Sequence, residues 1–110
     1  MYLFKEKTAI VTGAGSGIGR ELALGLARKG ARLAVTDIHA DRVDEVVSDI
    51  RKLGAETRGY VVDHSDLPAV EKFHNDFIED FGGVDVLCSN AGVGLGGEIK
   101  DMTIEDWQWI

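Results

Sequence analysis

The sequence predicts an α/β fold in which a parallel β-sheet is covered by helices on both faces. Short apolar runs alternate strictly along the chain with longer segments whose apolar residues recur at helical spacing. The short runs are apolar nearly throughout, which is typical of parallel strands that are buried on both faces. Glycines follow the helical segments, where they indicate helix stops. An alternation of this kind is expected to form a three-layer α/β/α domain.

The predicted strands share an apolar and β-branched bias, with Asp85 as their one charged residue. They are Thr8–Val11, Leu33–Thr36, Tyr60–Val62 and Val84–Cys88. Because right-handed crossovers join consecutive parallel strands, the expected strand order is 3-2-1-4. We therefore expect a Rossmann-type doubly wound sheet, to which residues 1–110 contribute one dinucleotide-binding domain.

Three helices are predicted between the strands, each from apolar residues that share one helix face. They extend from Ile18 to a stop at Gly30, from Asp41 to Leu53 with a stop at Gly54, and from a cap at Ser65 or Asp66 to the stop at Gly82 and Gly83. The residues expected on their apolar stripes are Ile18, Leu22, Leu26 and Ala27, then Val43, Val46, Val47, Ile50 and Leu53, then Val70, Phe73, Phe77 and Phe81.

A further helix is predicted to begin at Thr103, with Asp106 at the acidic position of a capping box. Trp107 and Trp109 are two residues apart on this helix and so cannot share one face. We expect one of them to pack on the sheet and the other to be exposed.

Composition places the chain among ordinary globular proteins. Of its 110 residues, 45% are hydrophobic and 28% are charged, and the formal net charge is −7. That length suits one domain or part of one, and an acidic chain is not expected to bind nucleic acid or anionic membranes. No apolar stretch approaches the ~20 residues of a membrane helix. The N-terminus lacks the apolar core of a secretory signal, so a cytoplasmic setting is expected.

Cysteine and histidine positions indicate neither a redox centre nor a metal site. Cys88 is the only cysteine, and its apolar neighbours predict a small buried hydrophobe. His39, His64 and His74 share no metal-ligand spacing with it. Solvated or capping roles are expected for the histidines.

The glycines after the first predicted strand have a direct chemical use. Gly13, Gly15, Gly17 and Gly19 lie between that strand and its helix. Backbone N–H groups at a helix N-terminus attract a pyrophosphate, and residues without side chains let it approach. A merely tight turn would explain the glycines alone, but their place between a strand and a helix favours dinucleotide binding.

Asp37 directly follows the second predicted strand, and an acidic residue at this place predicts NAD rather than NADP. Its carboxylate would accept hydrogen bonds from the adenosine ribose and repel a 2′-phosphate. A helix cap for the following segment is the alternative role. Ser16 in the turn is neutral, and the nearest cations are Arg20, expected to be a solvated helix residue, and Arg42.

The turn and the end of the third strand resemble the short-chain dehydrogenase/reductase family. Residues 12–19 read TGAGSGIG and resemble the family's TGxxxGxG phosphate turn. Asp63 matches the aspartate that in this family bonds the adenine amino group. The backbone N–H of His64 would then face the adenine ring.

The segment after the fourth strand carries the same resemblance. Residues 89–92 read SNAG and are similar to the family's NNAG, with Ser89 in place of the first Asn. The resemblance implies that Asn90 steadies the sheet while Ala91 and Gly92 pass close to the adenosine ribose. The full candidate set for cofactor binding is Gly13, Gly15, Ser16, Gly17, Ile18, Gly19, Asp37, Ile38, Asp63, His64, Asn90, Ala91 and Gly92.

The family's catalytic residues have no match here, because the Asn, the Ser and the YxxxK pair that it uses cannot be located. Tyr2 is followed four places later by Glu6, and Tyr60 by His64. The resemblance implies hydride transfer between nicotinamide and a small carbonyl compound or secondary alcohol, with this chain as the N-terminal, cofactor-binding half and inactive alone. It also implies a homo-oligomer formed through the helix near Thr103.

Two other functions stay open at this point. A non-catalytic dinucleotide-binding remnant or module would equally lack the catalytic residues. An S-adenosylmethionine-dependent methyltransferase has a similar glycine turn and acidic residue, although Asp63 and residues 89–92 argue against it.

Overall fold

The computed structural model describes residues 3–92 and 97–109. Strands and helices alternate as predicted, and the four strands form one parallel sheet of order β3-β2-β1-β4. The strands are β1 (Thr8–Val11), β2 (Arg32–Asp37), β3 (Thr57–Val61) and β4 (Val86–Cys88). This order confirms the expected 3-2-1-4 arrangement.

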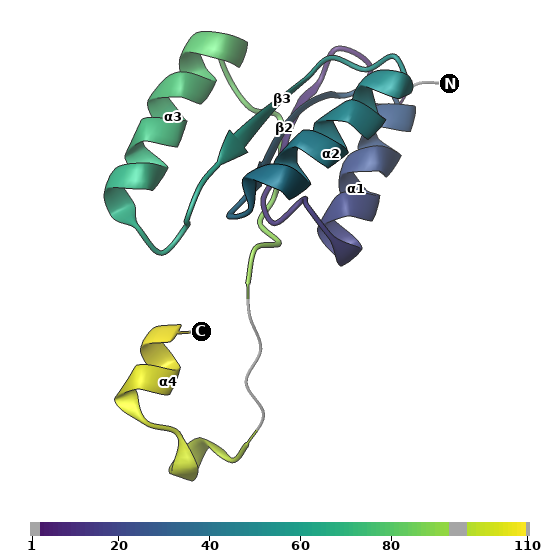
Figure 1. Ribbon diagram of the computed structural model, residues 1–110. Helices are drawn as coiled ribbons and strands as arrows, with labels where there is room; N and C mark the ends of the chain where they lie inside the picture. The colour runs from purple at the N-terminus through teal and green to yellow at the C-terminus, as the bar shows by residue number, and fades with distance from the viewer. Residues whose placement is uncertain (1–2, 93–96, 110) are drawn as a thin grey trace.

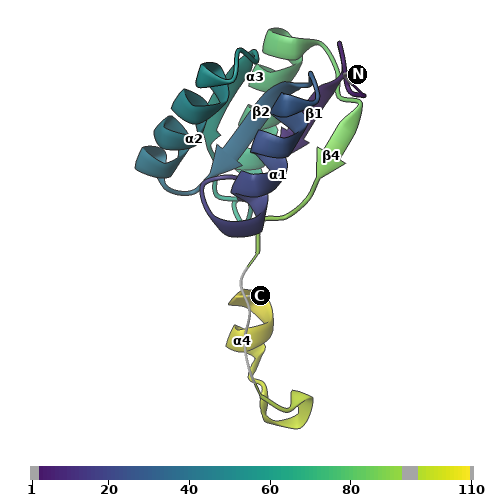
Figure 2. The ribbon, with the colours of Figure 1, turned by 90° about the vertical axis from the view of Figure 1, so that its right-hand side faces the viewer.

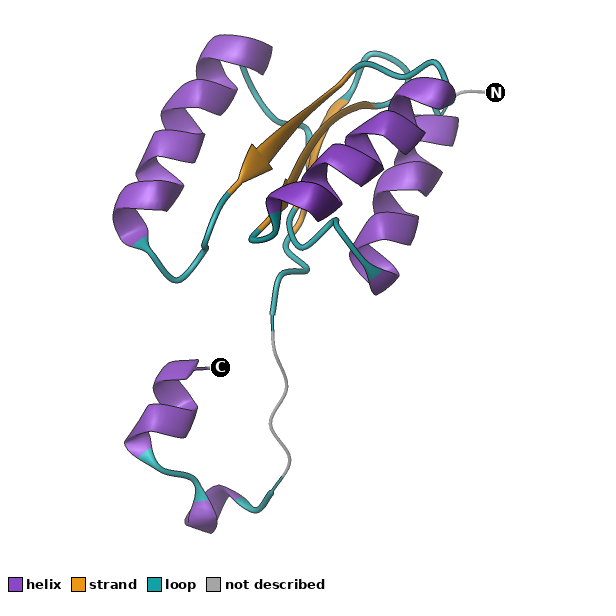
Figure 3. Cartoon of the chain, viewed as in Figure 1, coloured by secondary structure: helices purple, strands orange, loops and turns teal. Residues whose placement is uncertain are grey.

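Helices cover both faces of the sheet (Figures 1 and 3). The helices of this domain are α1 (Gly17–Arg28), α2 (Ala40–Lys52) and α3 (Leu67–Phe81). Figure 1 shows α1 and α2 on one side of the sheet and α3 on the other. The architecture is therefore the expected three-layer α/β/α sandwich.

Alternate strand residues supply two separate cores, because successive side chains of a strand point to opposite faces. Val11 and Val35 pack with α1 and α2 in the larger core. Ile10 and Ala34 pack in the smaller core against the phenylalanines of α3. Cys88 is only half-buried, at the margin of the larger core, because β4 is an edge strand.

Strand β3 begins at Thr57, three residues before the predicted start. Its first residues are not apolar, since Thr57 is buried with its hydroxyl bonded to the Leu33 carbonyl and Arg58 is exposed on this edge strand, so the apolar pattern found only the end of the strand. Gly59 lies beneath α2, where a Cβ atom would overlap the side chain of Val43 and lie 2.8 Å from that of Val47. The glycine thus lets α2 pack directly on this strand.

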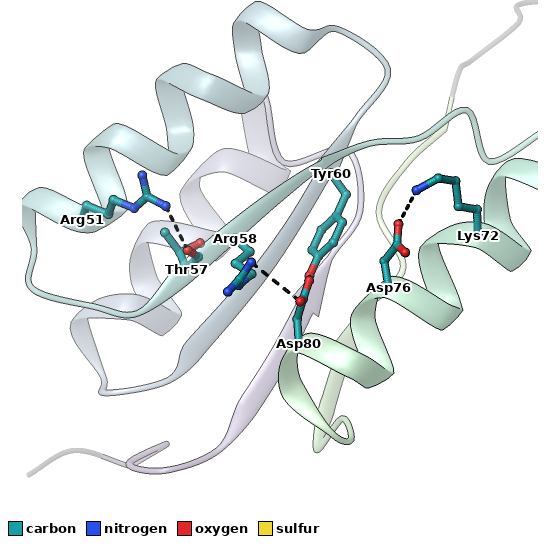
Figure 4. A network of polar contacts seen from close by, with 7 residues as sticks. All are labelled: Arg51, Thr57, Arg58, Tyr60, Lys72, Asp76 and Asp80. Atoms are coloured by element: carbon teal, nitrogen blue, oxygen red, sulfur yellow. Dashed lines mark hydrogen bonds and ion pairs between the residues drawn. The ribbon is translucent and has the colours of Figure 1, made fainter.

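Polar side chains tie β3 to the helices on both sides of the sheet (Figure 4). The Tyr60 hydroxyl donates to Asp80 of α3 at 2.7 Å, and Arg58 lies 3.6 Å from the same carboxylate. Arg51 of α2 reaches the carbonyl of Thr57. Burial, followed by the hydrogen bond to Asp80, raises the pKa of Tyr60 above its ordinary value.

Strand β4 is shorter than predicted because Asp85 does not continue the ladder. Its carboxylate accepts the N–H of Thr8 at 2.8 Å, and its own N–H donates to the Thr8 carbonyl. These two bonds satisfy the backbone N–H and carbonyl groups of Thr8, the first residue of β1. Leu87 of this edge strand is 61% exposed.

Two predicted apolar stripes are partly wrong. Ile18 and Leu22 are 74% and 39% exposed, because α1 turns a different face to the sheet. That face carries Ala23, Leu24, Leu26 and Ala27. Leu53 is also exposed, because α2 ends at the residue before it.

The segment 97–109 contains a short 3₁₀ turn (Ile99–Asp101) and helix α4 (Ile104–Trp109). The predicted capping box is confirmed: the N–H of Thr103 donates to Asp106 at 2.9 Å, and the N–H of Asp106 donates to the Thr103 hydroxyl at 3.1 Å. Trp107 and Trp109 are each 57% exposed, so the expectation that one packs on the sheet is wrong. Figures 1 and 2 show the reason, since α4 stands apart from the sheet.

No helix in the described part of the chain is both long and apolar enough to cross a membrane.

Candidate dinucleotide-binding site

The candidate residues follow the carboxyl ends of four neighbouring strands. Residues 12–19 follow β1 and enter α1, residues 37–38 end β2, residues 63–64 follow β3, and residues 90–92 follow β4. Because the strands are parallel, all of these segments lie at one edge of the sheet, where ligands of such folds bind.

The N-terminus of α1 is open at this edge. Ser16 is the N-cap residue but makes no side-chain cap bond, and the first turn holds no acidic residue. Gly17 has a left-handed φ of 56°, and a Cβ atom there would meet nothing within 4 Å. The first N–H groups of a helix have no partner inside it. This helix end can therefore accept an anion.

Gly13, Gly15 and Gly19 are enclosed rather than open. A Cβ atom on Gly13 would lie 2.9 Å from the Cα of Ala91, and one on Gly15 would lie 2.6 Å from the Asp37 carboxylate. At Gly19 it would overlap the carbonyl oxygen of Gly13. The inner side of the turn is thus closely packed, against backbone at Gly13 and Gly19 and against side chains at Gly15, while Ser16, Gly17 and Ile18 are exposed.

Asp37 joins the end of β2 to the turn. Its Oδ2 accepts the N–H of Gly15 at 3.0 Å, and its Oδ1 accepts the N–H of His39 at 3.0 Å. The N-cap of α2 is His39, so Asp37 is not the cap that the alternative role required. The side chain of Ile38 is exposed beside it.

Asp63 organises the loop after β3. Its Oδ1 accepts both the N–H and the hydroxyl of Ser65, at 2.9 and 2.6 Å. These bonds, led by the one from the hydroxyl, lower the pKa of Asp63. The helix that follows has Asp66 as its N-cap, one of the two predicted residues.

His64 is exposed, as the solvated role predicts, but its ring also contacts the sheet. Its Nε2 is hydrogen-bonded to the hydroxyl of Thr36 at 2.8 Å, and its ring meets Phe73 edge-on. Thr36 is completely buried in β2. A single sequence holds no signal for this contact, because the pairing crosses between strands.

Asn90 ties the loop after β4 to the turn after β1. Its side-chain amide donates to the carbonyls of Thr12 and Gly13, both at 3.3 Å. The Thr12 hydroxyl accepts the backbone N–H groups of Asn90 and Ala91, both at 2.9 Å. Gly92 follows on the exposed side of this loop.

Thr12 was missed as a functional candidate, although it appears in the turn motif. Its hydroxyl fixes the relative position of two loops that enclose the site. The sequence did hold a signal for this contact. Thr12 and Asn90 each follow a strand, and those two strands are neighbours in the expected sheet order.

The two nearby arginines differ in what they contact. Arg20 was expected to be solvated, but its side chain is half-buried and its guanidinium lies 2.5 Å from the carboxylate of Asp49 in α2. Arg42 is exposed, and it enters no ion pair within residues 3–92 and 97–109. Over the same residues, no cluster of side chains suits a metal ion.

The sheet order, the helices on both faces and the glycine turn after β1 define a Rossmann-type α/β protein. The chain matches the short chain dehydrogenase family over residues 7–110, and it belongs to that family.

Relatives and solved structures agree with this assignment. Trihydroxynaphthalene reductase from Colletotrichum orbiculare is 39% identical over 105 residues, covering 94% of this chain and 37% of the relative. A short chain dehydrogenase/reductase from Burkholderia phymatum in complex with NAD is 38% identical with a TM-score of 0.88, covering 99% of this chain and 39% of that one.

A third similar protein carries the other coenzyme. L-Sorbose reductase from Gluconobacter frateurii, complexed with NADPH and L-sorbose, is 32% identical with a TM-score of 0.91. The match covers 99% of this chain and 42% of that one. The chain thus spans less than half the length of these proteins.

Proposed function

We propose that this chain is the cofactor-binding half of an NAD-dependent short-chain oxidoreductase that transfers hydride between nicotinamide and a carbonyl compound or secondary alcohol. The observation that carries the proposal is the Asp37 carboxylate, which two backbone N–H groups hold at the edge of the glycine turn. The names of the relatives, a reductase of trihydroxynaphthalene among them, support redox chemistry on small molecules.

The residues at the site fit a dinucleotide. The uncapped N-terminus of α1 would hold the pyrophosphate, because its N–H groups and the helix dipole favour negative charge. Asp37 would accept hydrogen bonds from the adenosine ribose. Ile38, Asp63 and the backbone of His64 would border the adenine, and residues 90–92 would border the ribose.

The charges near Asp37 favour NAD over NADP. A 2′-phosphate would come close to the Asp37 carboxylate, and like charges repel strongly where water is partly excluded. Arg20 cannot offset this repulsion, because it is already paired with Asp49. A dinucleotide without the 2′-phosphate meets no such repulsion.

The bound cofactor would supply the hydride, while the protein supplies position and electrostatics. The two tyrosines of the chain, Tyr2 and Tyr60, each lack a lysine four residues later. Tyr60 is bound to Asp80 on the outer edge of the sheet. The 110 residues alone are therefore proposed to bind the cofactor without catalysing the reaction, and the acid or base is proposed to lie outside them.

The proposal is tested by calorimetric titration of NADH into the protein and two matched variants. Asp37→Asn removes the charge and one of the two acceptors, and should weaken NADH binding by about 1 to 3 kcal/mol. Asp41→Asn removes the same charge from an exposed position nearby and should leave the affinity unchanged.

Equal affinities in the Asp37→Asn variant and the unaltered protein would remove Asp37 from the site. Binding of S-adenosylmethionine without NADH would favour a methyltransferase instead. Binding of NADH by a full-length natural product of only this size would favour the non-catalytic module.

We also propose that the protein assembles into homo-oligomers through α4. Trp107 and Trp109 expose large apolar surfaces on this short helix, and such side chains are enriched in protein interfaces. Light scattering of the full-length protein tests this. A concentration-independent monomer would contradict it, and replacement of both tryptophans by serine should dissociate the oligomer.

A further inference from the structure

Two polar groups of the loop after β3 have no hydrogen-bond partner within residues 3–92 and 97–109. The backbone N–H of His64 donates to no acceptor among these residues. Asp63 accepts both bonds from Ser65 through Oδ1, so among the same residues its Oδ2 accepts none. A donor and an acceptor thus stand side by side on this loop. The Watson–Crick edge of adenine offers the complementary pair, the N1 acceptor beside the amino donor.

The side chain of His64 holds the residue that carries this N–H. Its Nε2 lies 2.8 Å from the hydroxyl of Thr36, which is completely buried in β2. Phe73 of α3 meets the imidazole edge-on, with 6.3 Å between the ring centroids. Beyond the bond from the Val62 N–H to the Asp37 carbonyl, no backbone hydrogen bond in the described part of the chain joins β2 to this loop. The imidazole therefore continues the connection to β2 where the backbone ladder stops.

We propose that Thr36 and His64 are positioning residues that make the site selective for adenine over other purines. The bond between their side chains holds the N–H of His64 toward N1 of the base while Asp63 accepts the amino group. Neither side chain needs to touch the base, because both act through the backbone at position 64. The inference rests on the proposed function, since that function brings an adenine to the loop after β3.

Hypoxanthine is a probe for this pair of groups. It has a carbonyl oxygen in place of the amino group of adenine, and an N1–H donor in place of the N1 acceptor. The bonds from Ser65, led by the one from its hydroxyl, lower the pKa of Asp63, and an ionised carboxylate can only accept. Both groups of the loop would therefore face the wrong partner. NADH and deamino-NADH, which carries hypoxanthine, differ only at this edge.

The test is calorimetric titration of NADH and deamino-NADH into the unaltered protein and two variants at position 64. His64→Gln places its amide the same number of bonds from the backbone as Nε2, whereas His64→Asn places it where Nδ1 would be. His64→Gln should therefore keep the preference for NADH. His64→Asn should reduce that preference by roughly two- to tenfold, as one lost hydrogen bond would.

Variants at Thr36 test the other member of the pair. Thr36→Val should reduce the preference for NADH as His64→Asn does, and Thr36→Ser, which keeps a hydroxyl, should not. A loss of stability alone cannot give this pattern, because it would weaken the binding of both coenzymes alike. Circular dichroism shows which variants are folded, and if Thr36→Val is not, the comparison at position 64 decides.

His74→Leu is the matched control, since it removes an imidazole from an exposed position of α3. It should leave the preference for NADH over deamino-NADH unchanged.

Two results overturn the inference while sparing the proposed function. One is an unaltered protein that binds NADH and deamino-NADH equally well. The other is an equal preference for NADH in His64→Gln and His64→Asn. Failure of the unaltered protein to bind NADH overturns the proposed function, and the inference with it.

Discussion

The imidazole of His64 lies 2.8 Å from the hydroxyl of Thr36, so the loop after β3 is bonded to the end of β2. Thr36 directly precedes Asp37, and His64 directly follows Asp63. The bond thus links the segments that carry the two candidate carboxylates. Phe73 of α3 supports the imidazole with an edge-on contact at 6.3 Å between ring centroids.

Replacing His64 by leucine should lower the free energy of unfolding by about 1 to 3 kcal/mol, because the buried Thr36 hydroxyl loses its partner. The double variant with Thr36→Val should recover part of that loss, since no unpaired hydroxyl remains buried. Urea unfolding of the four proteins measures the coupling. Strictly additive losses would show that the bond contributes nothing.

Gly19→Ala should destabilise the protein and abolish NADH binding. Its Cβ would overlap the carbonyl oxygen of Gly13 and lie 2.5 Å from the Asn90 amide. Gly25→Ala is the control on the same helix, where a Cβ meets nothing within 4 Å. It should stabilise the protein by roughly 0.5 to 1 kcal/mol through helix propensity. Equal changes in stability and NADH affinity for Gly19→Ala and Gly25→Ala would contradict the packing described for the turn.

Thr12→Val should cost about 1 to 3 kcal/mol of unfolding free energy, because it leaves the N–H groups of Asn90 and Ala91 without their acceptor. Thr57→Val is the matched control in another strand. The Thr57 hydroxyl donates to the carbonyl of Leu33, so its loss strips no N–H group of an acceptor. The midpoint of thermal unfolding, monitored by circular dichroism, should be lower for Thr12→Val than for Thr57→Val. The opposite order would refute the conclusion that the Thr12 hydroxyl holds the two loops together.

Tyr60→Phe should change how stability depends on alkaline pH. Burial and the hydrogen bond to Asp80 raise the pKa of Tyr60 above its ordinary value of 10.0. Its contribution to stability is fully present below pH 10.0, and it is lost as pH rises toward the folded-state pKa. The wild-type advantage in urea midpoint should therefore be largest near neutral pH and smaller at about pH 11. If the difference in urea midpoint between the wild type and Tyr60→Phe stayed constant with pH, Tyr60 would have the same pKa in the folded and unfolded states.

Apolar patterning predicted β1 and β2 because buried parallel strands are mostly apolar, and right-handed crossovers between the strands then predicted the sheet order. It placed β3 poorly, because the first residues of that strand are not apolar: Thr57 is buried with its hydroxyl hydrogen-bonded to Leu33, Arg58 is exposed, and Gly59 admits α2. The exposed Ile18 shows another limit. An apolar spacing identifies a helix face but not which face meets the sheet.

The candidate site was predictable where spacing along the chain defines it, as in residues 13–19 and at Asp37. Contacts across the sheet were not, because partners such as Thr12 and Asn90 are far apart in sequence. The pairing of Arg20 with Asp49 is of the same kind. Each of these contacts can be identified only when the spatial arrangement of the strands and helices is known.

Direct comparison of NADH and NADPH tests the central claim most sharply. Calorimetric titration of the unaltered protein with each coenzyme, at one ionic strength, yields the two dissociation constants. A ribose held at the Asp37 carboxylate predicts tighter binding of NADH. Tighter binding of NADPH, or binding of neither, would contradict the proposed site.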